Sequence, residues 1–119
     1  MVHIRVKDEA TAKALRSRLG QDFPVHMFNG SWEDGARAAV VTTANDTSPA
    51  ECSELTHRGY AVVLLVPAVR QQEREAYVRA GARAYLEMSP DATELVRALR
   101  ALDAEVLSGR APAALPHAS

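Results

Sequence analysis

The chain has 119 residues, 14 basic and 15 acidic side chains, a net charge of −1 and a 47% hydrophobic fraction, which indicates one domain with a single core. This charge excludes attraction to nucleic acid or an anionic membrane by bulk charge, and the chain has neither the ~20-residue apolar run of a membrane span nor a signal-peptide pattern. A single cysteine, Cys52, excludes an internal disulfide framework and fits a reducing cytoplasm.

The first strand is expected over residues 1–7, where apolar and polar side chains alternate. Its polar face carries His3, Arg5 and Lys7, which is unusual for a strand covered by helices on both sides. Burial of these groups without partners would be costly. Two interpretations stay open: their stems pack while their heads reach water, or the face lines a polar pocket or an interface.

Two helices with clear start signals follow in the first half of the chain. Asp8 can cap a helix that runs to Leu19, because its carboxylate can accept hydrogen bonds from the first turn. Ser48-Pro49-Ala50-Glu51 combines an N-cap, a proline at the first position and an acid at the third, which predicts a helix ending near Arg58-Gly59. Between these helices we predict strands at 24–28 and 38–43 and a short helix at 31–37.

Residues 61–88 have the pattern of a strand, a crossover helix and a second strand. The run from Ala61 to Val66 is apolar on both alternating faces, as in a strand buried between helices, and Pro67 ends it. Gly81 can take the positive φ with which a chain leaves a helix, and residues 82–88 form the next strand. This order implies a parallel sheet. The apolar stripe of the helix comprises Val69, Ala76, Tyr77 and Ala80.

The last helix is expected to begin at Ser89-Pro90-Asp91 and to end at Gly109, so that the domain covers residues 1–109. Residues 110–119 are rich in alanine and proline and are interpreted as a linker or frayed tail. Five strands alternating with five helices predict a flavodoxin-like, three-layer α/β sandwich with a five-stranded parallel sheet of order 2-1-3-4-5. The inward residues of the last helix are Leu95, Val96, Leu99, Leu102 and Val106.

The segment from Tyr77 to Leu102, YVRAGARAYLEMSPDATELVRALRAL, resembles the receiver domain of bacterial response regulators. The resemblance is to receivers found N-terminal to LuxR/NarL-type DNA-binding domains. It comprises the AGA at a helix end, a Tyr-Leu pair in the last strand and a helix that starts at Ser-Pro and carries paired leucines. Over residues 1–59 the resemblance is limited to the order of elements.

In that family an aspartate ending the third strand accepts a phosphoryl group. Acidic residues after the first strand, a hydroxyl ending the fourth and a lysine ending the fifth assist it. Asp46, beyond the end of the third strand, would be a poor substitute for the aspartate because its reach and in-line geometry differ. In this sequence Thr43, Val66 and Met88 stand where the family has the aspartate, the hydroxyl and the lysine, whereas the aromatic Tyr85 is retained. The resemblance therefore implies a degenerate, or pseudo-, receiver that keeps the fold and the signalling context and is not an enzyme. Its degenerate pocket would comprise Asp8, Glu9, Thr43, Val66 and Met88.

Two functions are compatible with this resemblance, and both would operate in the cytoplasm. The first is an atypical, phosphorylation-independent regulatory domain of a response-regulator transcription factor, acting as a homodimer, through a small-molecule ligand, or both. It would reach DNA only through a C-terminal domain absent from this chain. The alternative is a stand-alone interaction module that docks a signalling partner. A helix-turn-helix encoded beyond Ser119 would favour the first. The expected switch and dimer surface comprises Tyr85, Arg97 and Arg100.

No metal or cofactor site is expected from the sequence. Asp8 and Glu9 could form an acidic metal pair, but a divalent cation needs three or more oxygen ligands, and capping of the following helix explains both residues. The four histidines lack the spacing of zinc ligands. Cys52 has no histidine placed to activate it and is expected to be a small buried residue.

Overall fold

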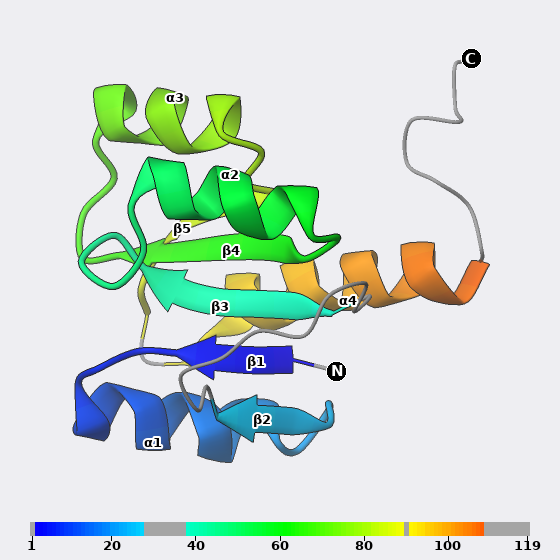
Figure 1. Ribbon diagram of the computed structural model, residues 1–119. Helices are drawn as coiled ribbons and strands as arrows, with labels where there is room; N and C mark the ends of the chain where they lie inside the picture. Colours follow the sequence, from blue (N-terminus) through cyan, green and yellow to red (C-terminus); the bar gives the residue numbers. More distant parts are fainter. Residues whose placement is uncertain (1, 28–37, 90, 109–119) are drawn as a thin grey trace.

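A computed structural model describes residues 2–27, 38–89 and 91–108, with side chains as far as Asp103 (Figure 1). The described elements alternate strands and helices along the chain. They are β1 (Val2–Arg5), α1 (Glu9–Leu19), β2 (Val25–Met27), β3 (Ala39–Thr43), α2 (Pro49–His57), β4 (Ala61–Val66), α3 (Gln71–Arg79), β5 (Ala84–Glu87) and α4 (Thr93–Ser108).

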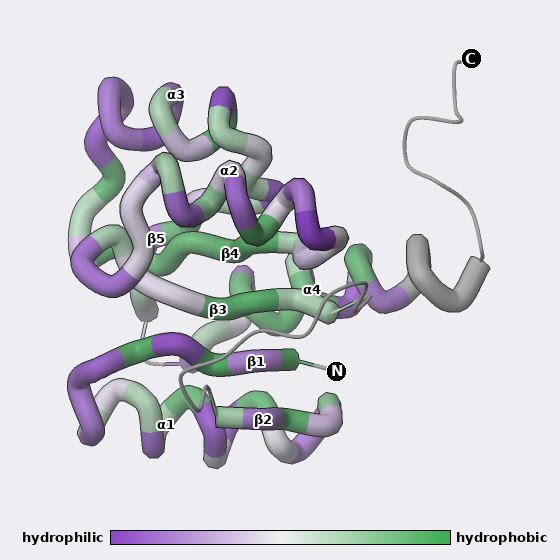
Figure 2. Tube along the Cα trace, viewed as in Figure 1, coloured by the Kyte–Doolittle hydropathy of each residue, from purple (hydrophilic) through white to green (hydrophobic). Residues whose placement is uncertain are grey.

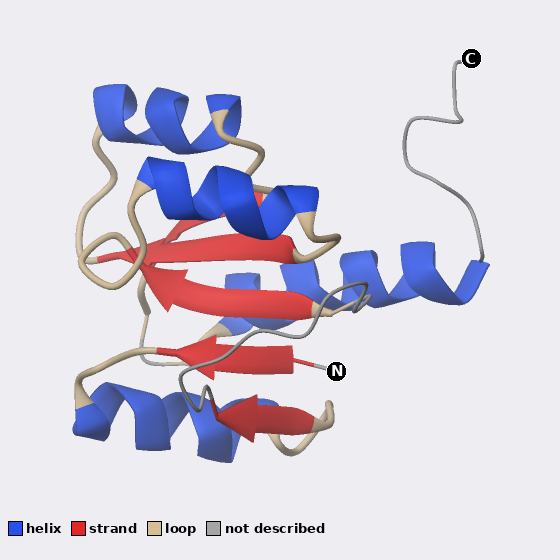
Figure 3. Ribbon diagram, viewed as in Figure 1, coloured by secondary structure: helices blue, strands red, loops and turns tan. Residues whose placement is uncertain are grey.

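All five strands lie in one parallel sheet with the order β2-β1-β3-β4-β5 (Figure 3). The switch in strand order lies between β1 and β3, whose register pairs Arg5 with Thr42. The predicted flavodoxin-like α/β fold is confirmed. In such sheets the carboxyl ends of the strands beside the switch form the usual place for a site.

Two apolar clusters hold the helices against the sheet. Ile4 and Val41 face α1 and α4, and on that side Leu99 is 2% exposed, as predicted for the inward face of the last helix. Val40 and Val62 face α2 and α3, where Cys52 is buried as expected. Figure 2 shows that β3 and β4 are strongly hydrophobic, whereas α3 is largely hydrophilic. The sheet is therefore the middle layer of a three-layer sandwich.

Several predicted boundaries were wrong because of local backbone conformation. The crossover helix begins at Gln71 because Arg70 is extended at φ −121°, and Val69 lies in the preceding loop with 46% exposure instead of in the apolar stripe. The last helix begins at Thr93, since Ala92 takes a left-handed φ of 53° that is incompatible with a helix. The expected positive φ of Gly81 is confirmed at 107°.

The first and the last strand in the chain are shorter than predicted. The first strand ends at Arg5 and the last covers only 84–87. The predicted helix at 31–37 and the tail at 110–119 lie outside the described residues. Within the described ranges, no helix combines the length and apolar character that a membrane crossing requires.

Candidate functional site

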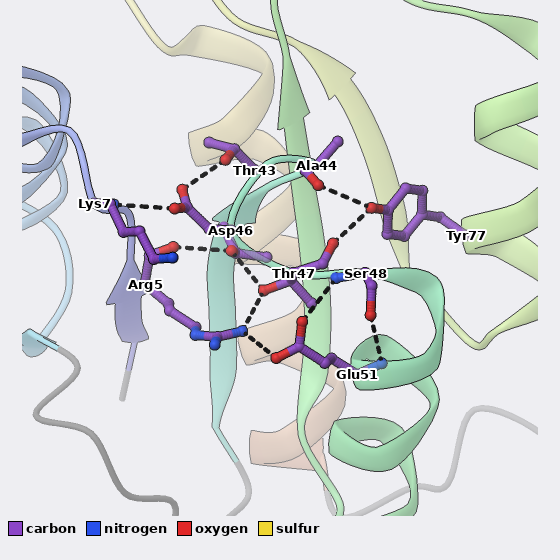
Figure 4. A network of polar contacts seen from close by, with 10 residues as sticks. Arg5, Lys7, Thr43, Ala44, Asp46, Thr47, Ser48, Glu51 and Tyr77 are labelled. Carbon is purple, nitrogen blue, oxygen red and sulfur yellow. Dashed lines mark hydrogen bonds and ion pairs between the residues drawn. The ribbon is translucent and has the colours of Figure 1, made fainter.

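The candidate site lies at the carboxyl ends of β1 and β3 and is built around the loop of residues 44–47 between β3 and α2 (Figure 4). The loop begins with a tight turn in which the backbone N–H groups of Asp46 and Thr47 both donate to the carbonyl oxygen of Thr43, at 3.1 and 3.0 Å. This turn directs the side chains of Asp46 and Thr47 back toward the sheet, where both are buried. The loop therefore contributes polar groups to the sheet edge instead of presenting them to solvent.

Asp46 is bound by donors of its own chain. One carboxylate oxygen accepts the hydroxyl proton of Thr43 at 2.6 Å, and the other accepts the backbone N–H of Lys7 at 3.3 Å. The residue is only 9% exposed. A carboxylate is thus held between the ends of β1 and β3.

On the side of the sheet that faces α2, Arg5 takes part in a closed circuit of hydrogen bonds. Its Nη1 donates to the hydroxyl of Thr47 at 2.9 Å, and its carbonyl oxygen accepts the hydroxyl proton of Thr42 at 2.8 Å. The two threonine hydroxyls lie 2.8 Å apart. Because a hydroxyl has one proton and that of Thr42 is used, Thr47 donates to Thr42. Each of the two buried hydroxyls therefore donates one hydrogen bond and accepts another, and these bonds fix the loop to β1 and β3.

Glu51 joins this circuit to α2. Its carboxylate lies 3.1 Å from Nη1 of Arg5 and also accepts the backbone N–H of Ser48 in a capping box, the helix start that the sequence predicts. The hydrogen bond from the Ser48 backbone, and after it the Arg5 guanidinium, lower the pKa of Glu51. The polar face of the first strand is thus paired at Arg5.

A tyrosine of α3 contacts the same loop from the other side. The hydroxyl of Tyr77 donates to the carbonyl oxygen of Thr47 at 2.5 Å, and the carbonyl oxygen of Ala44 lies 3.3 Å from the same hydroxyl. Its ring stacks on Tyr85, with centroids 6.3 Å apart. The hydroxyl of Tyr85 in turn donates to Glu73 at 2.5 Å and accepts the backbone N–H of Arg70 at 3.3 Å.

The residues predicted for a degenerate phosphorylation pocket are only partly brought together. Asp8 caps α1, where hydrogen bonds from the hydroxyl and backbone N–H of Thr11 lower its pKa, and Glu9 is exposed in the same turn. Thr43 binds Asp46 as described above. Val66 is 1% exposed in the apolar cluster under α2 and α3, and Met88, 36% exposed, offers an apolar side chain.

The residues of the predicted switch and dimer surface have different environments. Tyr85 is a residue of β5, and its side chain is buried against α3. Arg97 is exposed on α4. Arg100 is bound within the domain, because its Nη2 lies 2.9 Å from the carboxylate of Asp22. Arg97 and Arg100 are therefore both exposed, and Arg100 also forms an ion pair within the domain.

The sequence pointed to Arg5 as unusual but did not reveal its partners, and it did not reveal the role of Tyr77. The pair of hydroxyls at Thr42 and Thr43, at the end of an apolar strand, was the signal that could have indicated polar partners for Arg5. A lone tyrosine in a largely charged helix was the signal that could have indicated the role of Tyr77. His3 stacks on His26 at 5.7 Å between ring centroids. Where the structure describes the chain, no three histidine, cysteine or acidic side chains converge as metal ligands would.

The site as a whole can hold a loop in one conformation, with the Asp46 carboxylate bound by two donors at the sheet edge. Comparison of the chain with models of protein families, and with curated proteins, gives no match. A function must therefore be argued from the fold and from this site.

Proposed function

We propose that this domain is a receiver-like regulatory domain that works without phosphorylation. The observation that carries the proposal is the position of Asp46, whose carboxylate is bound by Thr43 and Lys7 between the ends of β1 and β3. A phosphoryl group would need those donors and would bring further negative charge next to a buried carboxylate. In this proposal the Asp46 carboxylate is a permanent anionic group where a receiver would acquire a transient one.

The remaining chemistry of phosphoryl transfer also lacks suitable groups. Stabilising the transferred group requires a hydroxyl and a cation close to its oxygens. The corresponding positions hold Val66, which faces the apolar core, and Met88. Asp8, the nearest candidate for a metal ligand after β1, is used by the first turn of α1. Together with the position of Asp46, these observations favour a domain that acts by binding and not by catalysis.

The resemblance of residues 77–102 to receivers of LuxR/NarL-type regulators supports the context of this binding. In that context the domain would act in the cytoplasm as the N-terminal part of a transcription factor. It would present DNA-binding domains in pairs through self-association, with or without a small ligand. Within the described part of the chain, β5 has one neighbouring strand and is an edge strand, which is a common place for contacts between copies.

The test is to offer the domain a phosphoryl donor. We expect that acetyl phosphate with Mg²⁺ leaves the intact mass unchanged, and that beryllofluoride with Mg²⁺ leaves the amide resonances around Asp8 and Asp46 unchanged. A receiver known to be phosphorylated, treated in parallel, would show that both reagents are active. A phosphoryl adduct, or a saturable shift at those resonances, would contradict the proposal.

A further inference from the structure

The hydroxyl of Tyr77 spans the loop that carries Asp46. It donates to the carbonyl oxygen of Thr47 at the end of the loop and lies 3.3 Å from that of Ala44 at its beginning (Figure 4). Tyr77 itself belongs to α3 and is 3% exposed. A single side chain from α3 therefore contacts both ends of the loop between β3 and α2, with its hydrogen bond at the Thr47 end.

The ring of Tyr77 continues the connection toward β5. It lies against the ring of Tyr85 with an interplanar angle of 25°. The hydroxyl of Tyr85 contacts the carboxylate of Glu73 and the backbone N–H of Arg70, both at the amino-terminal end of α3. We call the contacts of Tyr77 with Ala44, Thr47 and Tyr85 the Tyr77 bridge.

A buried phenol is costly to separate from its acceptors, because no water can replace them. Burial, and after it the charge of Glu73, raise the pKa of Tyr77 to about 12, so that the hydroxyl remains a donor at ordinary pH. If the carbonyl groups of the loop move, the favourable response is for the ring to move with them. Such a movement would alter the packing of Tyr77 on Tyr85.

We propose that Tyr77 is a positioning residue that couples the loop of residues 44–47 to α3 and β5. Release of Asp46 from Thr43 and Lys7, or contact of a partner with the exposed side chain of Asn45, would shift the carbonyl groups that the Tyr77 bridge holds. The change would then reach the amino-terminal end of α3 through Tyr85. This inference goes beyond the proposed function and does not depend on it, because it concerns the internal mechanics of the fold.

The test compares the effect of one perturbation in two backgrounds. Asp46→Asn removes the charge of the loop carboxylate and is the perturbation. In the otherwise unchanged protein, we expect it to shift the amide resonances of the loop, of Gln71–Arg79 and of Tyr85. In a Tyr77→Phe background, which keeps the ring and removes the hydroxyl, we expect shifts at the loop and Lys7 but none in α3.

A matched control is Tyr60→Phe, which changes another buried tyrosine of the same apolar cluster. Tyr60 packs edge-on against His3, with ring centroids 5.8 Å apart, on another part of the sheet. Transmission from Asp46 to α3 should survive this substitution. Equal α3 shifts in the Tyr77→Phe and unchanged backgrounds would overturn the proposal, and so would an absence of α3 shifts in both.

A second variant tests the far end of the connection if Tyr77→Phe fails to fold. Tyr85→Phe removes the hydroxyl that contacts Glu73 and Arg70 and leaves the Tyr77 hydroxyl in place. In this background Asp46→Asn should still shift the resonance of Tyr77 but not those of residues 70–73. Undiminished shifts at 70–73 would overturn the proposed route independently of the first variant and of any result with phosphoryl donors.

Discussion

Arg5 of β1 and Glu51 of α2 form an ion pair of 3.1 Å at the end of the sheet where the candidate site lies. The same guanidinium nitrogen donates to Thr47, so the pair ties the loop of residues 44–47 to both a strand and a helix. The side chains of Arg5 and Glu51 are 20% and 45% exposed. Solvent therefore screens the carboxylate more than the guanidinium, and the attraction between them should be modest.

A double-mutant cycle with Arg5→Met and Glu51→Gln should measure this attraction. We expect a coupling energy of about 0.2–1 kcal/mol, the range of partly exposed ion pairs. Arg5→Met alone should cost more than Glu51→Gln alone, since it also leaves Thr47 without a donor, whereas glutamine can still accept the Ser48 N–H. Urea denaturation of the four proteins gives these values. Additive effects would mean that the pair contributes nothing.

The pH dependence of stability should report the state of Glu51. Its pKa in the folded domain is lowered from the ordinary value of 4.5, chiefly by the Ser48 backbone N–H. The unfolded chain therefore binds the proton more readily, so the contribution of Glu51 is fully present above pH 4.5 and is lost as the pH falls below that value.

We expect the melting temperature to decrease as the pH is lowered below 4.5, and to decrease less steeply in Glu51→Gln than in the unchanged protein. Hydrogen bonds from the neighbouring Arg18 and Thr11 also lower the pKa values of Asp22 and Asp8. Those carboxyl groups should give both proteins a shared residual slope in acid. Identical melting curves for the two proteins from neutral pH into acid would contradict the assignment to Glu51.

The sequence alone was sufficient for the fold because its signals were redundant. The apolar run of Ala61–Val66 and the capping box at Ser48 and Glu51 each specify an element locally. The site was less predictable, since the partners of Arg5 lie far along the chain. Thr47 and Glu51 reach Arg5 only because a turn at Thr43 reverses the loop. Hydrophobic periodicity does not encode such a turn.

Tyr77 shows a second reason why the sequence analysis missed part of the site. Its place in the apolar stripe of the crossover helix was predicted correctly, and the ring is buried. The pattern that places a ring does not indicate where its hydroxyl finds an acceptor. Which group accepts the hydroxyl proton depends on the distance between α3 and the loop after β3. The packing of the apolar cluster under α2 and α3 sets that distance.

Gly81→Ala should destabilise the domain for two separable reasons. The residue has a φ of 107°, which side chains other than that of glycine rarely adopt, at a cost of roughly 1–3 kcal/mol. An added Cβ would also lie 2.7 Å from Oγ1 and Cγ2 of Thr56 on α2. The Thr56 side chain has little freedom to move, because its hydroxyl donates to the carbonyl oxygen of Cys52 at 2.9 Å.

A Thr56→Ala background removes the two contacts at 2.7 Å and leaves only the Cβ of residue 56 at 3.0 Å, so the steric part should become smaller, whereas the conformational part should remain. Denaturation experiments should therefore show that Gly81→Ala costs less in Thr56→Ala than in the unchanged protein, but still more than zero. An equal cost in both backgrounds would mean that α2 moves away from the added methyl group. That result would place the whole effect in the backbone of Gly81.

The last prediction concerns self-association, which we expect to involve α3, β5 or α4. Among the strands that the structure describes, β5 pairs only with β4, so one edge of its ladder has no described neighbour. The adjacent helices carry charges of both signs, so a two-fold contact could pair the same patch with itself. Arg97 is exposed on α4, whereas Arg100 is already bound to Asp22. Arg97→Glu is therefore a cleaner probe than a substitution at Arg100, which would also disturb the domain itself.

Sedimentation equilibrium should show a dimer of the unchanged protein and a dissociation constant at least tenfold higher for Arg97→Glu, which corresponds to about 1.4 kcal/mol. Lys13→Glu makes the same change of charge at an exposed position of α1 and should leave the dimer unaffected. A protein that stays monomeric at hundreds of micromolar would reject self-association. If Lys13→Glu weakened the dimer and Arg97→Glu did not, the contact between the two copies would involve α1 and not α4.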